Sequence, residues 1–221
     1  MPLITYEDIK SNEEFRTYIE MGDEHLGVIG YTKHDFGHVG KVADTAGKIL
    51  KELGYSDREV ELAKIAGYIH DIGNMVNRDE HAQTGACLSF NVLKTLGMDP
   101  KEIALVVSAI GNHDEGTGNP INPISAALIL GDKADVRRSR VRNNDFSTFD
   151  IHDRVNYAVE KAVVRVDGEE RTVQLDLVID PTICSIMEYF EIFINRMILC
   201  RKAAEFLYSE FQLTINGAKI L

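Results

Sequence analysis

Four histidines and two aspartates stand at the edges of apolar helical segments, where their side chains could meet around metal ions. They are His38, His70, Asp71, His81, His113 and Asp132. A buried aspartate needs a cation or hydrogen-bond donors, because taking its charge out of water is costly. A set of imidazoles and carboxylates suits Fe, Mn, Co, Ni or Zn better than Ca or Mg, which prefer oxygen ligands. These residue types therefore predict a centre for divalent transition metals.

His70 and Asp71 lie near the end of a mostly apolar stretch, residues 65–74, which has the character of a helix inside the core. Six protein ligands are too many for one catalytic metal that keeps an open position, so they suit two metals that share a carboxylate. Asp71 is the predicted bridge, and His70 and Asp71 are the predicted catalytic residues. An isolated His-Asp pair would simply face solvent at a helix end, but the other four residues favour a metal site here.

The composition is that of a globular chain with an acidic balance. Its 221 residues suffice for one domain or for a domain with an appendage. The net charge of -11 argues against a surface for double-stranded nucleic acid, whereas bound metals could still attract a small phosphorylated substrate. Three scattered cysteines indicate reduced thiols in a cytoplasmic protein. No apolar run is long enough for a membrane span and residues 1–7 lack a secretion signal, so we expect no membrane contact.

Hydrophobic periodicity predicts a mainly α fold, in which a helical bundle is followed by a small β-hairpin or sheet and a long helix. Caps and apolar repeats place helices at residues 11–25, 34–53, 56–71, 80–96, 99–113 and 123–138. The last third combines a helix over 149–162, strands at 163–166 and 172–179, a helix over 182–210 and a strand at 213–215. We expect a helical metal-binding domain over 1–150 and an α+β appendage over 151–221. The appendage would pack on the same unit or make a homo-oligomer contact.

The spacing of the candidate ligands resembles the H…HD…D signature of the HD-domain metal-dependent phosphohydrolases. His38, His70-Asp71 and Asp132 match that signature, and residues 66–73 are similar to the apolar helix before the family's HDIG motif. Residues 81–86 resemble the H-x-x-x-G-A segment of the binuclear subgroup, and residues 110–113 resemble the next histidine of that subgroup. Residues 128–135 resemble the last helix with its aspartate ligand. The resemblance covers about residues 34–142.

This resemblance implies an HD-domain helical bundle that holds two divalent transition metal ions. His38, His70 and Asp132 would hold one metal, and His81 and His113 would hold the other. The implied activity is hydrolysis of a nucleotide or related phosphate ester through a metal-bridged hydroxide, in a phosphomonoesterase or phosphodiesterase. The binuclear subgroup includes diadenosine tetraphosphate hydrolases and cyclic-di-GMP phosphodiesterases.

The chain departs from its apparent relatives at several positions. Many of them have lysine where Asn74 stands, so a cation near the phosphate is missing or comes from elsewhere. The cyclic-di-GMP phosphodiesterases have two adjacent histidines where this chain has His113-Asp114, and a Gly-Tyr-Pro motif that this chain lacks. These differences argue against cyclic-di-GMP as the substrate. Two other functions stay open on the same ligand set: a di-iron HD-type oxygenase and a non-catalytic nucleotide-binding metal module.

Candidates for substrate contact come from polar residues near the predicted ligands. They are His34, Asn74, Lys133, Arg137 and Arg138. His34, one turn before His38, faces either the substrate, a third metal or the surface. The arginines at 137–142 form either a solvated helix end or a phosphate contact. For Glu115 we expect a solvated loop acid, and Asp114 is either such an acid or a partner of a ligand.

Overall fold

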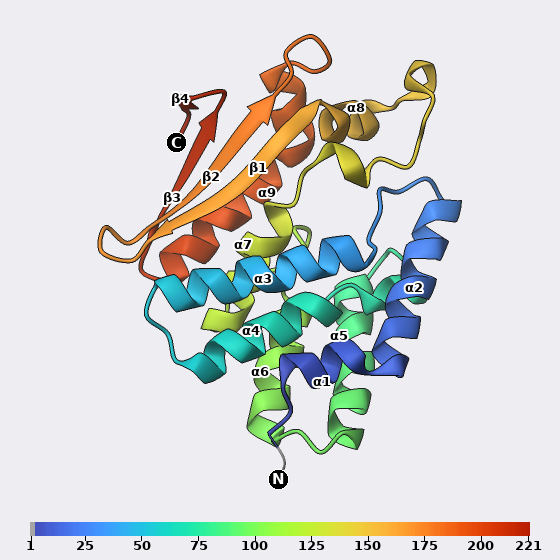
Figure 1. Cartoon of the computed structure of the whole chain (residues 1–221), viewed down its shortest axis with the longest axis vertical. Helices are drawn as coiled ribbons and strands as arrows, with labels where there is room; N and C mark the ends of the chain where they lie inside the picture. The colour runs from blue at the N-terminus through green and yellow to red at the C-terminus, as the bar shows by residue number, and fades with distance from the viewer. Residues whose placement is uncertain (1–2) are drawn as a thin grey trace.

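Helices make up most of the molecule, and a small sheet with one long helix lies at one end of it (Figure 1). The computed structural model describes residues 3–221. Its helices are α1 (Tyr6–Ser11), α2 (Glu13–Val28), α3 (Phe36–Glu52), α4 (Asp57–Ile69), α5 (His81–Thr95), α6 (Pro100–Gly111), α7 (Pro123–Lys133), α8 (Ile151–Ala158) and α9 (Ile186–Phe206). Short 3-10 helices are η1 (Ile72–Met75), η2 (Arg138–Arg140) and η3 (Phe146–Thr148). The predicted mainly α fold with an appended sheet and long helix is confirmed.

Local sequence signals fix where several of these helices begin. The Ser56 hydroxyl accepts from the Glu59 amide while the Glu59 carboxylate accepts from the Ser56 amide, a capping box that starts α4. The Asp35 carboxylate caps α3 and so sets the position of His38 in its first turn. Proline occupies the first turn of both α6 and α7, where its missing N–H leaves no hydrogen bond unmade.

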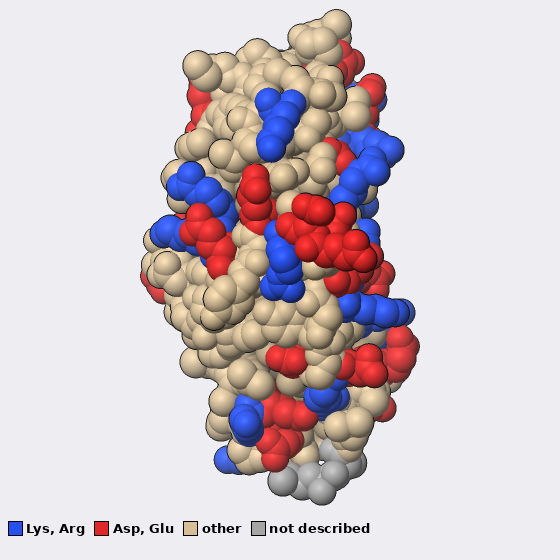
Figure 2. Space-filling model, turned by 90° about the vertical axis from the view of Figure 1, so that its left-hand side faces the viewer, with Lys and Arg blue, Asp and Glu red and all other residues tan. Residues whose placement is uncertain are grey.

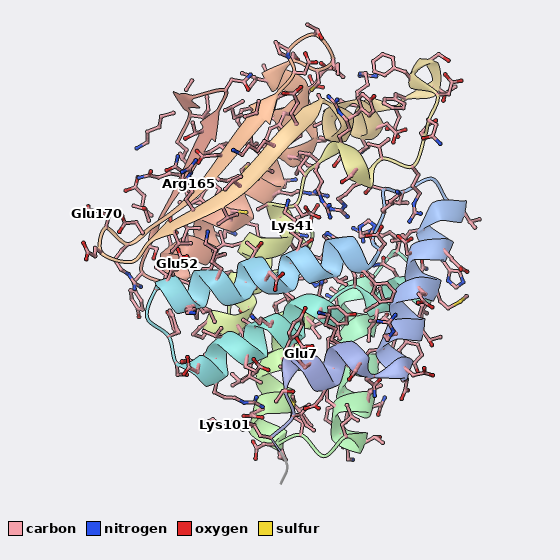
Figure 3. All side chains as sticks on the ribbon, viewed as in Figure 1. Glu7, Lys41, Glu52, Lys101, Arg165 and Glu170 are labelled. Atoms are coloured by element: carbon pink, nitrogen blue, oxygen red, sulfur yellow. The ribbon has the colours of Figure 1, made fainter. Side chains whose placement is uncertain are left out.

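The sheet contains β1 (Val159–Asp167), β2 (Thr172–Ile179), β3 (Glu210–Ile215) and β4 (Ala218–Lys219), in that spatial order. β1 pairs antiparallel with β2, whereas β2 pairs parallel with β3. A parallel pair needs a crossover, and α9 supplies it behind the sheet (Figure 1). Buried β2 side chains Val173, Leu175 and Leu177 alternate with polar ones. The front face is exposed to solvent and carries Arg165, which pairs with Asp176 (Figure 3).

The centre of the molecule is a close stack of α3, α4 and α7. Two glycines permit it, since a Cβ at Gly67 of α4 would lie 2.7 Å from the Ala43 Cα of α3. At Gly131 of α7 a Cβ would lie 3.0 Å from the Val42 carbonyl oxygen, again on α3. The three helices that carry His38, His70 and Asp132 are therefore held at backbone contact. One hydrophobic cluster continues from these helices into α9 and the sheet.

Several predicted boundaries are wrong. The helix expected over 182–210 spans only Ile186–Phe206, because the chain turns and β3 begins at Glu210. The helix expected over 123–138 ends at Lys133, because the chain then turns extended and Asp135 faces α3 instead of continuing the helix. The helix expected over 149–162 ends at Ala158, because β1 begins at Val159 and pairs with β2. Residues 151–221 pack on the helices through α9 and α7. The division at residue 150 stays a prediction.

The surface carries charges of both signs. On the face drawn in Figure 2, lysines and arginines alternate with acidic residues and form no continuous basic stripe. None of the helices within residues 3–221 combines the length and the apolarity that a bilayer crossing requires.

Replacing Gly67 tests the close approach of α3 and α4. We expect Gly67→Ala to lower the free energy of unfolding by about 1–3 kcal/mol, because its Cβ would press on the Ala43 backbone. Gly40→Ala, in α3, is the matched control, since among the described residues no heavy atom lies within 4 Å of an added Cβ there. The control should be neutral or stabilise by about 0.5–1 kcal/mol. Urea unfolding followed by circular dichroism measures both, and equal effects would contradict the packing account.

Candidate metal centre

The six candidate ligands sit at the ends of helices that converge on one point. His38 lies in the first turn of α3 and His81 begins α5. His70 caps the end of α4 and Asp71 follows it directly. His113 comes just after α6, and Asp132 lies in the last turn of α7. Residues far apart in the chain are thus brought together by the places where helices start and stop.

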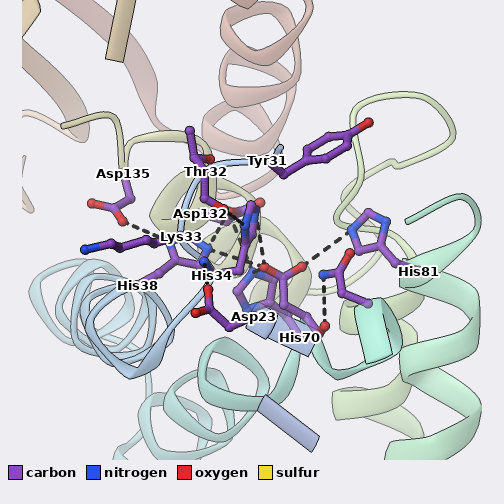
Figure 4. A network of polar contacts seen from close by, with 12 residues as sticks. Asp23, Tyr31, Thr32, Lys33, His34, His38, His70, His81, Asp132 and Asp135 are labelled. Carbon is purple, nitrogen blue, oxygen red and sulfur yellow. Dashed lines mark hydrogen bonds and ion pairs between the residues drawn. The ribbon is translucent and has the colours of Figure 1, made fainter. Parts of the chain in front are cut away.

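Asp71 is central to this cluster. Figure 4 shows His38, His70, His81 and Asp132 gathered in the same network of polar contacts. Its Oδ2 lies 3.3 Å from Nε2 of His70 and 3.5 Å from Nε2 of His38. Its Oδ1 lies 3.5 Å from Nε2 of His81 and 3.8 Å from Nε2 of His113. Each oxygen of one carboxylate therefore faces a different pair of histidines, the arrangement expected of a carboxylate that bridges two cations.

Asp132 completes the first of these two groups. Its Oδ1 lies 3.4 Å from Nε2 of His38 and 3.7 Å from Nε2 of His70. Groups with the spacing of metal ligands are found in His38, His70 and Asp71, in His70, His113 and Asp132, and in Asp71, His81 and His113. The predicted ligands are thus all brought together in the described part of the chain.

The histidine rings are held in one tautomer by their outer nitrogens. Nδ1 of His70, His81 and His113 lies 2.9, 3.0 and 2.6 Å from the backbone carbonyls of residues 67, 78 and 110. A carbonyl only accepts, so Nδ1 carries a proton in each ring, and Nε2 turns a lone pair inward whenever the ring is neutral. Nε2 of His81 and Nε2 of His113 are 3.2 Å apart, where two lone pairs would repel each other without a cation between them.

The donor set fits divalent metals. Nε2 of His38 and Nε2 of His70 are buried and have no hydrogen-bond partner within residues 3–221. A buried nitrogen without a hydrogen-bond partner destabilises the folded state, and coordination of a metal would provide that partner. Imidazole nitrogens with carboxylate oxygens match Zn, Fe, Mn, Co or Ni. His38, His70 and Asp132 would hold one ion, His81 and His113 would hold another, and Asp71 would contact both.

Electrostatics lead to the same conclusion. Burial would lower the pKa of His70, but the carboxylates of Asp71 and Asp132 raise it to about 10. That shift shows how strongly these carboxylates favour a positive charge at their centre. Burial lowers the pKa of His81 to about 4, so its imidazole is neutral and ready to coordinate at neutral pH.

Asp135 is a partner of a candidate ligand that sequence reasoning missed. Its Oδ2 accepts from Nδ1 of His38 at 2.8 Å, which fixes the tautomer of that ring. Its Oδ1 lies 2.9 Å from Nζ of Lys41, on α3 (Figure 3), and accepts from Nε of Arg137 at 2.9 Å. The carboxylate is fully buried, and its pKa is held below the usual range by His38 and Arg140 against the effect of burial. An acidic residue one turn after Asp132 was the signal that could have found it.

A cavity of about 450 Å³ opens beside the ligands. Six of its lining side chains that are not candidate ligands carry cationic or imidazole groups: His34, Arg78, Lys133, Arg140, His152 and Arg196. His34 and Lys133 were predicted to contact substrate, and the structure brings both to this cavity. Asn74, Arg137 and Arg138 do not line it. The Asn74 amide donates instead to the Asp71 carbonyl at 2.9 Å.

His34 faces the centre and not the surface. Nδ1 lies 2.7 Å from the Thr32 carbonyl, and Nε2 lies 4.0 Å from Oδ2 of Asp71. Burial and the nearby Arg140 keep the pKa of His34 well below its usual value, although Asp71 opposes them. The ring is therefore a neutral acceptor at the rim of the ligand cluster.

Glu115 is not the solvated loop acid that the sequence suggested. Its Oε2 lies 2.6 Å from Nζ of Lys133, and its Oε1 accepts from Nε of Arg196 at 3.0 Å. Lys133 also lies 2.7 Å from Oδ2 of Asp132, so it joins Glu115 to a candidate ligand. Lys133 and Arg196 hold the pKa of Glu115 low despite its burial. The prediction failed because the partner Arg196 comes from α9, far away in sequence.

The arginines at 137–142 have structural contacts. Because α7 ends at Lys133, they do not form the helix end that the sequence suggested. Arg138 donates to the Tyr157 carbonyl at 2.7 Å and stacks on the Tyr157 ring. Arg140 donates to the Lys33 carbonyl and Arg142 to the Tyr31 carbonyl. Arg140 and Arg142 fasten the loop that carries His34 to the segment after α7, whereas Arg138 holds that segment to α8.

Comparisons with known proteins agree with this arrangement. The model of the HD domain family matches residues 35–140. An uncharacterized protein of Methanocaldococcus jannaschii is 26% identical over 203 residues, which cover 81% of this chain and 77% of that protein. Ribonuclease Y 1 of Pediococcus pentosaceus is 36% identical over 125 residues, which cover 55% of this chain but only 22% of the relative.

Among solved structures, the crystal structure of a predicted HD superfamily hydrolase from an uncultured Thermotogales bacterium has a TM-score of 0.45 and 23% identity. The match covers 56% of this chain and 67% of that one. The family match places the start of α3, the His70-Asp71 pair and Asp132 within one domain. Residues 35–140 of this chain are thus identified as an HD domain.

Proposed function

We propose that this chain is a metal-dependent phosphohydrolase that acts on a nucleotide or a related phosphate ester. The observation that carries the proposal is the convergence of four Nε2 lone pairs on the two oxygens of Asp71. A site that concentrates lone pairs and negative charge in this way is built for cations rather than for binding a neutral ligand. Its opening into a cavity leaves room for a substrate beside the ligands.

Bound divalent metals would supply two things here: a lowered pKa for water, and positive charge opposite the phosphoryl oxygens. The protein supplies the rest. Asp71 and the histidines would hold the cations, and the carbonyl partners of Nδ1 keep the rings from rotating. Asp135 performs the same role for His38.

The cavity walls suit a phosphorylated molecule of nucleotide size. Its volume of about 450 Å³ lies within the roughly 300–1,000 Å³ of small-molecule sites. Arg78 and Arg140 bring guanidinium groups to the wall, and such groups bind phosphate oxygens in forked contacts. Arg78 stacks over the Tyr31 ring, which places a cation and an aromatic face together at the wall.

The relatives named ribonuclease Y suggest a second substrate, a phosphodiester in RNA. A screen should therefore contain nucleoside monophosphates, dinucleoside polyphosphates, cyclic dinucleotides and a single-stranded RNA oligonucleotide. Oxygen consumption with a polyol would instead identify a di-iron oxygenase. Nucleotide binding without turnover by the fully metallated protein would identify a binding module.

Removal of Asp71 or His70 tests the centre itself. We expect wild-type protein to hold two metals per chain and both Asp71→Ala and His70→Ala to lose metal. Hydrolysis should fall by more than about 100-fold, since even the outer partners of metal ligands are worth about 10–100-fold. Mass spectrometry of metal content with an assay on the best substrate measures both. His25→Ala, an exposed histidine outside the cluster, is the control, and full activity in either test variant would falsify the proposal.

Asp135→Asn tests the outer support of His38. The neutral amide of asparagine would stabilise positive charge on the His38 ring less than the Asp135 carboxylate does. Nε2 of His38 should therefore coordinate a metal less strongly. We expect metal affinity to fall by about 10–100-fold in competition with a chelator, with the fold retained in circular dichroism. The exposed Asp79→Asn is the matched control. Equal affinities in the two variants would show that Asp135 only packs.

Arg78→Ala tests the cavity wall. We expect KM to rise by about 10-fold or more, equivalent to about 1.5–3 kcal/mol for a charged hydrogen bond, with metal content unchanged. Arg138→Ala is the matched control, because Arg138 contacts Tyr157 outside the cavity lining. If KM rises for Arg138→Ala but not for Arg78→Ala, the phosphate contact is made by the arginines at 137–142 and not by Arg78.

A further inference from the structure

The outer face of α9 is apolar and exposed. Met187, Ile194 and Ile198 have exposed fractions of 69%, 45% and 38%. Eight of the eighteen exposed large hydrophobic residues of the described chain fall within residues 186–221. A patch of this kind on a chain with a full core marks an interaction surface.

The exposed residues follow a regular order along α9. At steps of four and three residues they are Met187, Glu191, Ile194, Ile198, Arg201 and Glu205. This is the spacing of a seam between two paired helices. The opposite face of α9 is already used, since Phe193 is buried and Arg196 reaches the cavity. The seam therefore has no partner within residues 3–221.

We propose that the seam binds the same helix of a second copy, antiparallel and related by a two-fold axis near residue 196. An isologous contact places each residue opposite one at equal distance from the axis. Ile194 then faces Ile198 of the second copy, and Glu191 faces Arg201 of the second copy. Both kinds of pair form twice, so one helix face is complementary to itself.

Charge complementarity favours this occupant. Glu191 stands on the amino-terminal side of the apolar centre and Arg201 on its carboxy-terminal side, so antiparallel pairing matches opposite charges. Within one chain the two are ten residues apart, about 15 Å along a helix, and cannot meet. Within residues 3–221, Arg201 has only a loose ion-pair partner, Glu205 at 3.9 Å, with both side chains more than half exposed. A face of mixed charge suits a second copy better than an anionic membrane, which selects basic residues.

The pairing is independent of the proposed phosphohydrolase function. It uses the outer face of α9, whereas Phe193 and Arg196 face the cavity from the inner face. The test therefore measures mass and not turnover.

The experiment is sedimentation equilibrium of the full chain across a range of concentrations. The wild type should sediment as a dimer. Ile194→Glu should weaken the dimer affinity by about 100-fold or more, as expected for a buried central contact. Glu191→Arg and Arg201→Glu should each weaken the dimer affinity by about 10-fold or more, because each places like charges opposite one another. The double variant should restore the affinity. Glu169→Arg, on an exposed turn, is the control.

The double variant makes the test specific. Restoration requires residues 191 and 201 to meet between chains, because they are too far apart to meet within one. A monomeric wild type at about 100 μM would overturn the proposal. If the single variants dissociate and the double variant does not restore the dimer, the proposed pairing of Glu191 with Arg201 of the second copy is wrong. Wild type that stays monomeric but sediments with phosphatidylglycerol vesicles would assign the patch to a membrane surface. If Ile194→Glu fails to fold, the charge variants still decide.

Discussion

The rest of the structure depends on keeping the Asp71 carboxylate almost out of water. An anion in that position is stable only if positive charge or donors surround it. Here the surrounding atoms are histidine Nε2 nitrogens, which stabilise the carboxylate either as protonated imidazoles or as ligands of a bound cation. The centre thus requires positive charge, and the helices that deliver the histidines must converge accurately enough to hold it.

Helix packing gives that accuracy. His38, His70 and Asp132 come from three different helices, and their separations are set by how closely α3, α4 and α7 approach. Gly67 and Gly131 allow backbone contact at those crossings. A larger residue would move a whole helix end, and the ligands with it, because closely packed interiors shift as rigid elements. Stability and metal geometry therefore share the same residues.

The candidate ligands could be predicted from the sequence because each is an unusual polar residue at the edge of an apolar repeat. The mainly α fold followed from periodicity and caps. Asp135 and the role of Glu115 could not be found in this way, because their partners His38 and Arg196 lie far off in the chain. Arg137 and Arg138 were misplaced because α7 ends five residues earlier than periodicity suggested. Tertiary contacts can override the local preference for helix.

The cavity and the metal centre have different origins in the chain. All six candidate ligands lie inside the HD domain match, residues 35–140. Eleven of the nineteen residues that line the cavity lie outside it, in the segment before α3 or in α8, its flanking loop and α9. The shared domain thus accounts for where cations bind, while the flanking segments shape what is bound beside them. Because those segments contribute Tyr31, Phe193 and Arg196, substrate choice would depend on parts of the chain that the family match does not describe.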